Sequence, residues 1–225
     1  MKSDAIALSA KDRLLQASIK IFASCGYEGA STRALTKEAG VNISAIPYYF
    51  KDKEGLYRSV LEFIAGKVRA EMAAKTGAVR AVLKDETVSA DACRAMLRDL
   101  LASFIRFLMS EEMSPSVARI FMREQIEPSV SFTMFYETTM RPMHETLTQL
   151  VARAAALPYP SEEATLCAHA VLGSITIFKT HRELALRRLK WKNLGNPEIE
   201  KITAVVLRHA DAAMDSYSGK EGKKS

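Results

Sequence analysis

The sequence is poor in cysteine and lacks a long apolar run, and both absences exclude classes of protein. Its three cysteines, Cys25, Cys93 and Cys167, are odd in number, far apart and set among apolar residues. That pattern argues against a disulfide framework and against a paired metal-binding knuckle. No stretch approaches ~18 uninterrupted apolar residues, and the first residues lack the apolar core of a signal peptide. We therefore expect a soluble, cytoplasmic protein with no membrane partner.

Sequence motifs of common enzymes are also missing. The chain has no HExxH, no Cys-x-x-Cys, no glycine-rich phosphate loop and no GxSxG. His144-Glu145 and His181-Arg182-Glu183 are runs of adjacent residues rather than ligands spaced along one helical face. We expect no catalytic residues, no metal and no cofactor.

Composition and charge permit a nucleic-acid partner without requiring one. The 225 residues carry a net charge of +6 and are 48% hydrophobic, which is ample for a buried core. Residues 1–57 hold 8 Lys and Arg against 6 Asp and Glu, so the basic excess is not concentrated at the amino end. The same composition fits many ordinary enzymes.

Apolar residues recur at helical spacing along nearly the whole chain, and alternating strand patterns are almost absent. The fold class is therefore expected to be all-α. The first helix is predicted over residues 9–24, where Ser9 and Asp12 form a capping pair and Gly26 follows the last turn.

Two short helices around a glycine turn come next. The pair Ser31-Thr32 caps a helix over residues 33–39, Gly40 ends it, and Asn42 caps a second helix over residues 43–50. This arrangement is typical of a helix-turn-helix, whose second helix enters the major groove of DNA. The free N–H groups at helix starts bind phosphate. The pattern therefore favours double-stranded DNA as a partner.

Residues 11–57, from KDRLLQ to KEGLY, resemble the DNA-binding domain of the TetR family of regulators. The shared marks occur in order as Phe22-Ala23, Gly26-Tyr27, Ser31-Thr32, Glu38-Ala39-Gly40-Val41, Tyr48-Tyr49-Phe50 and Lys51 to Leu56. The resemblance implies a three-helix DNA-binding head, followed by a linking helix and a larger helical-bundle body that binds an effector and dimerises. It also implies a ligand-responsive repressor as the usual outcome.

A subgroup of that family, the CecR-like regulators, is similar over more of the chain. The similar strings are AIPYYF at 45–50, REQIEPS at 123–129, MRPMH at 140–144 and RELALRRL at 182–189. Pro47 stands where an aromatic residue is more usual. We expect it to weaken or kink the second short helix, because proline lacks an N–H and its ring crowds the preceding turn.

The resemblance assigns DNA contacts to seven residues: phosphate contacts to Thr32, Tyr48 and Lys53, and base contacts to Arg33, Ser44, Ala45 and Pro47. Two more are expected from their own chemistry, Asn42 at a helix start and Tyr49 through its phenol group. Arg33 is suited to base reading because a guanidinium bonds O6 and N7 of guanine together. Alternatives stay open: Arg33 can touch only phosphate or solvent, and Lys53 can be a solvated cation at a helix end. Phe50 is expected in the core.

The rest of the chain is predicted to form long amphipathic helices that end at proline, glycine and serine residues. Their ranges are 53–75, 90–110, 115–126, 128–156, 161–189 and 197–217, with a loop over 79–88. Pro142 is expected to kink the helix over 128–156. The predicted domains are a head over 9–57 and a body over 58–217, followed by a disordered tail over 218–225.

An effector needs an apolar cavity with a few orienting polar groups. The candidates from this reasoning are Phe104, Met122, Arg123, Phe135, Tyr136, Met140, His144, Phe178 and His181. Each apolar member fits an ordinary helical core equally well. The polar members can also pair internally, since burying them unpaired is costly.

A homodimer follows from the limited reach of one recognition helix, because a two-fold pair reads two half-sites of a palindromic operator. The resemblance places the dimer interface on the helices over 161–189 and 197–217, with His169, Leu172, Ile199 and Val206 as expected contributors.

An effector would change the spacing of the two heads through the helix over 53–75. Such a regulator would act at the nucleoid. The alternatives are a helical enzyme and a protein-binding adaptor, neither of which would prefer an operator.

Overall fold

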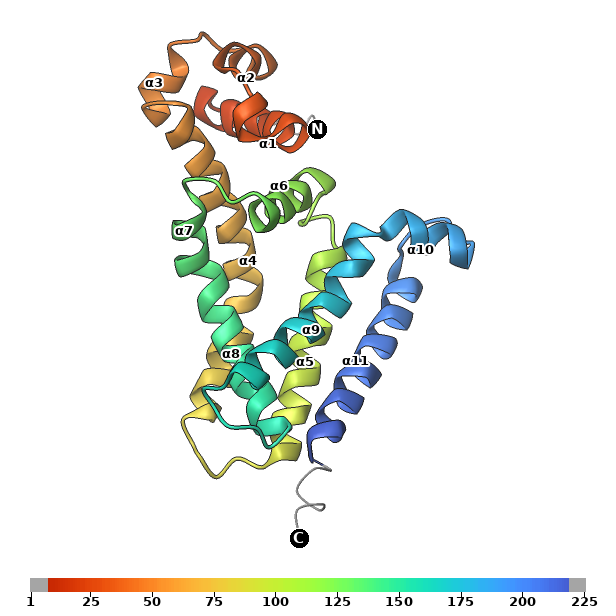
Figure 1. The fold of residues 1–225 in the computed structure, drawn as a ribbon. Helices are drawn as coiled ribbons and strands as arrows, with labels where there is room; N and C mark the ends of the chain where they lie inside the picture. Colours follow the sequence, from red (N-terminus) through yellow and green to blue (C-terminus); the bar gives the residue numbers. More distant parts are fainter. Residues whose placement is uncertain (1–7, 219–225) are drawn as a thin grey trace, which may run out of the picture. The chain divides into compact units, whose positions relative to one another are not determined.

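The computed structural model describes residues 8–218, and among these residues every regular element is a helix (Figure 1). The elements are α1 (Ala10–Gly29), α2 (Thr32–Ala39), α3 (Ala45–Phe50), α4 (Lys53–Leu83), α5 (Ala90–Met109), α6 (Pro115–Ile126), α7 (Phe132–Phe135), the π-helix η1 (Tyr136–Met140), α8 (Arg141–Ala154), α9 (Glu162–Thr180), α10 (Arg182–Leu189) and α11 (Asn196–Ser218). The all-α prediction is confirmed. The predicted tail lies outside the described residues except for Ser218.

Two compact units divide the chain. The first comprises the residues up to Val68 together with Ser114–Thr139, and the second comprises Arg69–Met113 together with the residues from Met140 onward. In the first unit α1 packs against α2 and α6, and the short α3 contacts both α1 and α2. The helix α4 contributes residues to both units.

Serine caps fix where several helices begin. Ser9, Ser31, Ser89, Ser114 and Ser161 each accept a hydrogen bond from the backbone N–H three residues later. Such a cap satisfies one of the N–H groups that a helix start leaves unpaired and contributes about 1 kcal/mol. The predicted capping roles of Ser9 and Ser31 are confirmed.

The second unit is a bundle in which α5 packs against α8 and α11, and α9 packs against α8 and α11. Ion pairs Arg94–Asp215 and Arg98–Asp211 join α5 to α11. Surface pairs of this kind contribute at most about 1 kcal/mol each. Burial of the apolar faces is the larger stabilising term.

The loop expected over residues 79–88 is wrong in its first half. The helix α4 continues to Leu83, because Val79 and Leu83 lie one turn apart on a buried face and are 6% and 3% exposed. The Arg153 guanidinium then donates hydrogen bonds to the carbonyl oxygens of Leu83 and Asp85, at 2.9 and 2.6 Å. These bonds satisfy carbonyl groups that the end of α4 leaves free.

The helix expected over 128–156 with a kink at Pro142 begins later, at Phe132, and has its irregular turn just before that proline. A four-residue helix, α7, leads into the π-helical turn η1, and α8 begins directly after it at Arg141. Pro142 has no N–H for the carbonyl four residues earlier, and its ring crowds that turn, which accounts for the widened geometry before it. The helix expected over 161–189 is likewise divided at His181, between α9 and α10.

Within residues 8–218, no helix is both long and apolar enough to span a bilayer.

Candidate nucleic-acid interface and effector cavity

The turn between α2 and α3 depends on Gly40. This residue has φ +62° and ψ +41°, a left-handed conformation that glycine adopts without strain. Its N–H and that of Val41 bond back to the carbonyls of Lys37 and Thr36, at 3.2 and 3.1 Å. The closed end of α2 therefore redirects the chain sharply into α3.

The start of α3 is organised by Asn42. Its Oδ1 accepts hydrogen bonds from both the N–H and the hydroxyl of Ser44, each at 2.9 Å. Pro47 is the third residue of α3, and the Tyr48 N–H bonds the Ser44 carbonyl at 3.1 Å. The expected weakening or kink at Pro47 is wrong, because the first turn of a helix has no intrahelical acceptor for that N–H anyway.

The six residues of α3 separate into a buried side and an exposed side. Ile46 and Phe50 are 2% and 7% exposed and join the core of the first unit, as expected for Phe50. Tyr48 is 80% exposed and Tyr49 40% exposed, with their rings edge to face at 4.7 Å. Pro47 is exposed beside them. Two phenol groups and a proline ring therefore face solvent from this helix.

The start of α2 offers a second set of exposed groups. Ser31 caps the helix through a 3.1 Å bond from the Ala34 N–H, Thr32 is half-buried and Arg33 is exposed. Ala45 at the start of α3 is half-buried, whereas Ser44 is exposed. Arg33 and Ser44 are therefore exposed side chains at the two helix starts.

Lys53, the first residue of α4, has an internal partner that the sequence did not reveal. Its ammonium donates to the Tyr27 carbonyl oxygen at 3.0 Å and lies 4.3 Å from the centre of the Tyr27 ring. Partial burial, followed by the carboxylates of Glu54 and Glu28, raises the pKa of Tyr27. Lys53 therefore ties the start of α4 to the end of α1.

A buried polar contact joins α4 to α6. The Tyr57 hydroxyl donates to Glu124 Oε1 at 2.5 Å, and the Ser129 N–H and hydroxyl donate to Oε2 at 3.2 and 2.9 Å. Tyr57 is 2% exposed and Glu124 1% exposed. Burial, followed by the bond to Glu124, raises the pKa of Tyr57, so the phenol remains a donor. Sequence reasoning missed Glu124, because nothing local distinguishes a buried glutamate from a solvated one.

Arg123, predicted to orient an effector, bonds the main chain of α1. Its Nη1 donates to the Phe22 carbonyl oxygen at 3.1 Å. A Cβ atom at Gly26 would lie 2.7 Å from that nitrogen, so the glycine leaves room for the guanidinium. Gly26 itself has φ +75° and breaks the helical geometry, after which α1 continues to Gly29. The expected break at Gly26 is confirmed, but the helix does not end there.

The remaining candidates in the first unit belong to aromatic clusters or the α6 surface. Phe135 is fully buried, with its ring edge-on to Phe121 at 5.8 Å. Tyr136 is 40% exposed and stacks on Phe132, and Met122 on α6 is half-buried. The predicted effector set is therefore divided, with four of its members in this unit.

In the second unit an apolar cavity lies in the bundle core. It is lined by Met72, Leu100, Leu101, Phe104, Met143, Leu147 and Leu172. Its free volume is about 10 Å³, roughly the space that one water molecule requires. Phe104 is the predicted effector residue that lines it, and an occupant of any size must displace side chains.

The other four candidates in this unit lie at the end of η1, on α8, on α9 and at the junction of α9 and α10. Met140 is 6% exposed, and Phe178 is half-buried. His144 is half-buried against His169, whereas His181 is exposed with its Nδ1 2.9 Å from the Thr180 hydroxyl. Among residues 8–218, no three His, Cys, Asp or Glu side chains are grouped so that they could share one metal ion.

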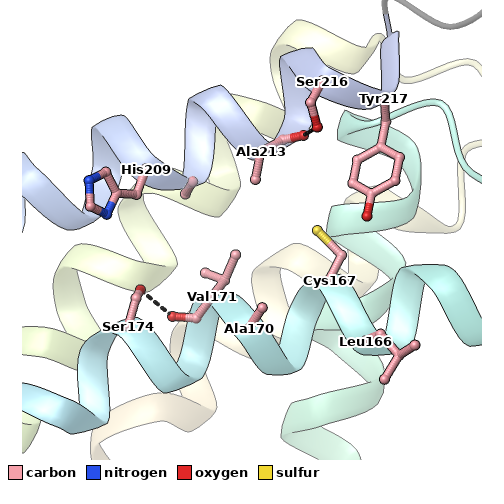
Figure 2. A pocket seen from close by; sticks show the side chains of 10 residues that line it. Leu166, Cys167, Ala170, Val171, Ser174, His209, Ala213, Ser216 and Tyr217 are labelled. Atoms are coloured by element: carbon pink, nitrogen blue, oxygen red, sulfur yellow. Dashed lines mark hydrogen bonds between the residues drawn. The ribbon is translucent and has the colours of Figure 1, made fainter.

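A groove runs between α9 and α11 (Figure 2). Its lining is mostly apolar or small, with Cys167, Ala170 and Val171 from α9 and Ala213 and Tyr217 from α11. The neighbouring face of α9 carries a stripe with helical spacing, formed by Leu166, Ala170, Gly173 and Ile177, all of them exposed. Leu166 and Ile177 are 62% and 49% exposed, so no helix within residues 8–218 covers this apolar surface.

Comparison with known proteins decides what these features belong to. Residues 14–60 match the family described as bacterial regulatory proteins, tetR family. Residues 93–216, more than half of the chain, match the C-terminal domain of the HTH-type transcriptional dual regulator CecR. The chain belongs to the CecR family of TetR-type transcriptional regulators. It is a DNA-binding regulator and not an enzyme.

A relative agrees with the assignment of this CecR-family regulator, and solved structures share its fold. It is 28% identical to the HTH-type transcriptional dual regulator CecR of Shigella flexneri, over 93% of each chain. Its fold is similar to AibR in complex with isovaleryl coenzyme A and operator DNA, with a TM-score of 0.62 at 14% identity, over 89% of this chain and 97% of that one. PfmR from Thermus thermophilus matches with a TM-score of 0.59 at 15% identity, over 92% and 97% of the two chains.

Proposed function

We propose that this regulator represses transcription as a homodimer bound to a palindromic operator, and that a small effector lowers its affinity for that DNA. The observation that carries the proposal is the exposed side of α3, where Pro47, Tyr48 and Tyr49 face solvent directly after a glycine turn. A helix in this setting fits the major groove. The structural neighbour AibR was solved with operator DNA, which supports the same use of the fold.

Roles within the interface follow from the chemistry of each group. We assign phosphate contacts to Thr32, Tyr48, Tyr49 and Lys53, and to the helix start that Asn42 organises, because hydroxyl, ammonium and backbone N–H groups bond phosphate oxygens. We assign base contacts to Arg33, Ser44, Ala45 and Pro47. Arg33 is the exposed guanidinium at the start of α2 and suits guanine, and the apolar Pro47 suits a thymine methyl.

Fluorescence anisotropy with a duplex from the gene's own promoter tests these roles. Arg33→Ala should reduce the binding free energy for the operator by about 1–3 kcal/mol. The difference in affinity between the operator and a random duplex should become smaller. Tyr48→Phe and Lys53→Ala should weaken both duplexes about equally, and Lys53→Ala should reduce the salt slope by about 1. Arg208→Ala, at an exposed site on α11, is the matched control and should leave both affinities unchanged. Equal losses on both duplexes for Arg33→Ala and Lys53→Ala would remove the distinction between base and phosphate contacts.

Because Lys53 also bonds Tyr27, the melting temperature of each variant must be measured beside its affinity. A Lys53→Ala variant that melts like the wild type and still binds all duplexes less tightly supports direct phosphate contact. A loss of affinity that follows the loss of stability would assign Lys53 a structural role instead.

The α9–α11 face is the surface we assign to the dimer. The stripe Leu166, Ala170, Gly173 and Ile177 is apolar, exposed and continuous with the groove in Figure 2. Two of the contributors expected from the sequence fit less well, since Val206 is 1% exposed and Leu172 lines the internal cavity. Sedimentation of Leu166→Glu tests the assignment: it should shift the protein toward monomer, while Glu163→Gln, one turn away, should not. An unchanged dimer in Leu166→Glu would exclude this face.

The effector site we propose is the cavity around Phe104. Its lining is wholly apolar, which favours an uncharged, hydrophobic occupant that opens the bundle as it enters. The other candidates are not among the residues that line this cavity. Roles in effector binding stay a proposal for Met140, His144, Phe178 and His181 in this unit and for Met122, Arg123, Phe135 and Tyr136 in the first unit. A thermal-shift screen of neutral hydrophobic compounds tests the site, since a stabilising compound should lose its effect in Phe104→Trp, which fills the space.

Coupling between effector and DNA is assigned to α4, which has residues in both compact units. For function we divide the chain into a DNA-binding domain over 9–57 and an effector and dimerisation domain over 58–217. A protein acting on chromosomal DNA would be found in the cytoplasm at the nucleoid.

A further inference from the structure

Two histidines from different helices meet in the second unit with their rings tilted against each other. His144 of α8 and His169 of α9 have ring centres 5.0 Å apart and ring planes inclined by 55°. His144 is half-buried and His169 is exposed, so the pair lies at the edge of the bundle. Neither the DNA interface nor the dimer stripe uses this pair.

The separation of the two ring centres is compatible with a shared metal ion. An imidazole nitrogen lies roughly 2.0–2.1 Å from zinc, which places the ring centre roughly 3.2 Å from the metal. Two rings at a tetrahedral angle around one ion then have centres roughly 5.2 Å apart. The observed separation of the ring centres, 5.0 Å, is close to that value, and binding requires one nitrogen of each ring to turn toward the ion.

The hydrogen bond of His169 leaves a ring nitrogen free for such an ion. Its Nδ1 lies 3.3 Å from the Thr165 carbonyl oxygen, and a carbonyl only accepts, so Nδ1 carries the proton. The lone pair is then on Nε2. Metal-binding histidines usually have this second bond, because it fixes the ring and raises its basicity.

We propose that His144 and His169 together bind one divalent transition-metal ion, through one ring nitrogen each, at the α8–α9 contact. Imidazole ligands suit Zn²⁺, Ni²⁺, Co²⁺ and Cu²⁺ rather than Mg²⁺ or Ca²⁺. No third His, Cys, Asp or Glu joins the pair among residues 8–218, so water fills the remaining positions and the ion exchanges readily. The site joins α8 to α9 and is separate from the proposed DNA contacts, and it shares His144 with the proposed effector residues.

Isothermal titration of tag-free protein with Zn²⁺, in the absence of DNA and effector, tests the proposal. One equivalent should bind per chain, and His169→Gln and His144→Gln should each lower the affinity about tenfold or more. His181→Gln is the matched control, because His181 is an exposed histidine at the end of the same helix α9, and it should bind as the wild type does. Mg²⁺ should give no saturable binding.

Three results would overturn the site: no Zn²⁺ binding below about 1 mM, equal binding by His169→Gln and the wild type, or binding lost in Cys25→Ser, which removes the exposed thiol. His169 is exposed, so His169→Gln should fold normally, and its melting curve without metal checks this. Zn²⁺ should raise the melting temperature of the wild type and of His181→Gln but not of His169→Gln. Because DNA is absent from every measurement, failure here leaves the proposed function untouched.

Discussion

Replacing Tyr57 by phenylalanine removes a single hydroxyl from the interior of the first unit and keeps the ring. That hydroxyl donates to Glu124 Oε1 at 2.5 Å, and both residues are at most 2% exposed. The ring keeps its edge-to-face contact with Phe22, with the centres 4.8 Å apart. The substitution therefore isolates one hydrogen bond to a buried carboxylate.

The size of the loss follows from what the carboxylate retains. Oε2 keeps its two donors from Ser129, while Oε1 loses its hydroxyl partner in a site that water does not reach. A hydrogen bond to a charged group contributes about 1.5–3 kcal/mol, and an unsatisfied buried acceptor costs a similar amount. We expect Tyr57→Phe to lower the free energy of unfolding by about 2–3 kcal/mol, or the melting temperature by about 4–12 °C.

Urea denaturation followed by circular dichroism at 222 nm measures this loss, at one fixed protein concentration because a dimer's stability depends on it. Tyr48→Phe is the matched control: its ring is 80% exposed, so the change in stability should stay below about 0.5 kcal/mol. The order should be reversed for DNA affinity. Tyr48→Phe should weaken DNA binding, whereas Tyr57→Phe leaves the DNA-contacting surface intact.

A double-mutant cycle with Glu124→Gln checks the cause. If the bond is responsible, Tyr57→Phe should cost far less in the Glu124→Gln background than in the wild type. The reasoning is refuted if Tyr57→Phe costs no more than Tyr48→Phe, or if the losses at positions 57 and 124 simply add.

Three further substitutions should give effects of different sign. Gly55→Ala should cost at least about 2 kcal/mol in urea melts, because its Cβ would lie 2.0 Å from the Phe50 carbonyl oxygen. Gly66→Ala should instead stabilise the protein by about 0.5–1 kcal/mol, since it lies inside α4 with nothing within 4 Å of a new Cβ; a loss there would contradict the helix. Folding lowers the pKa of His144, so below about pH 6.5 the unfolded chain binds more protons than the folded chain. As the pH is lowered further, the free energy of unfolding therefore decreases until His144 in the folded protein is protonated as well. His144→Gln lacks this term, so in urea melts the stability of the wild type relative to the variant should be lower at pH 5.5 than at pH 7.5, and a constant difference would count against the burial of His144.

Signals that act within one or two helical turns were readable from the sequence. Ser31 predicted the start of α2, and Gly40 its end in a left-handed turn, because caps and turn glycines act on backbone groups three or four residues away. The short recognition helix followed from the same signals. Pro47 was misjudged by position alone: a shift of the helix start to Ala45 moves it into the first turn, where proline is tolerated.

Errors in the second unit came from residues whose partners are far along the chain. Gly77 and the mixed charges after Val79 suggested a loop, but Val79 and Leu83 are buried and Arg153 bonds the carbonyl groups beyond them. Periodicity indicates which face of a helix is apolar. It does not indicate which distant arginine bonds the carbonyl groups at the end of that helix. The pairing of His144 with His169 was out of reach for the same reason.

The helix α6 packs in the first unit although it is far along the chain from α1 and α4. Two adjacent side chains of α6 bond it to these helices. Arg123 bonds the main chain of α1 at Phe22, and Glu124 accepts from Tyr57 of α4. Adjacent residues on a helix point about 100° apart, so one turn of α6 reaches two different helices. Because both acceptors are buried or partly buried, removing either donor leaves a polar group unpaired, which makes the arrangement specific as well as stabilising. The three-helix head is therefore supported by α6 as well as by its own packing, although α3 ends at Phe50 and α6 begins only at Pro115.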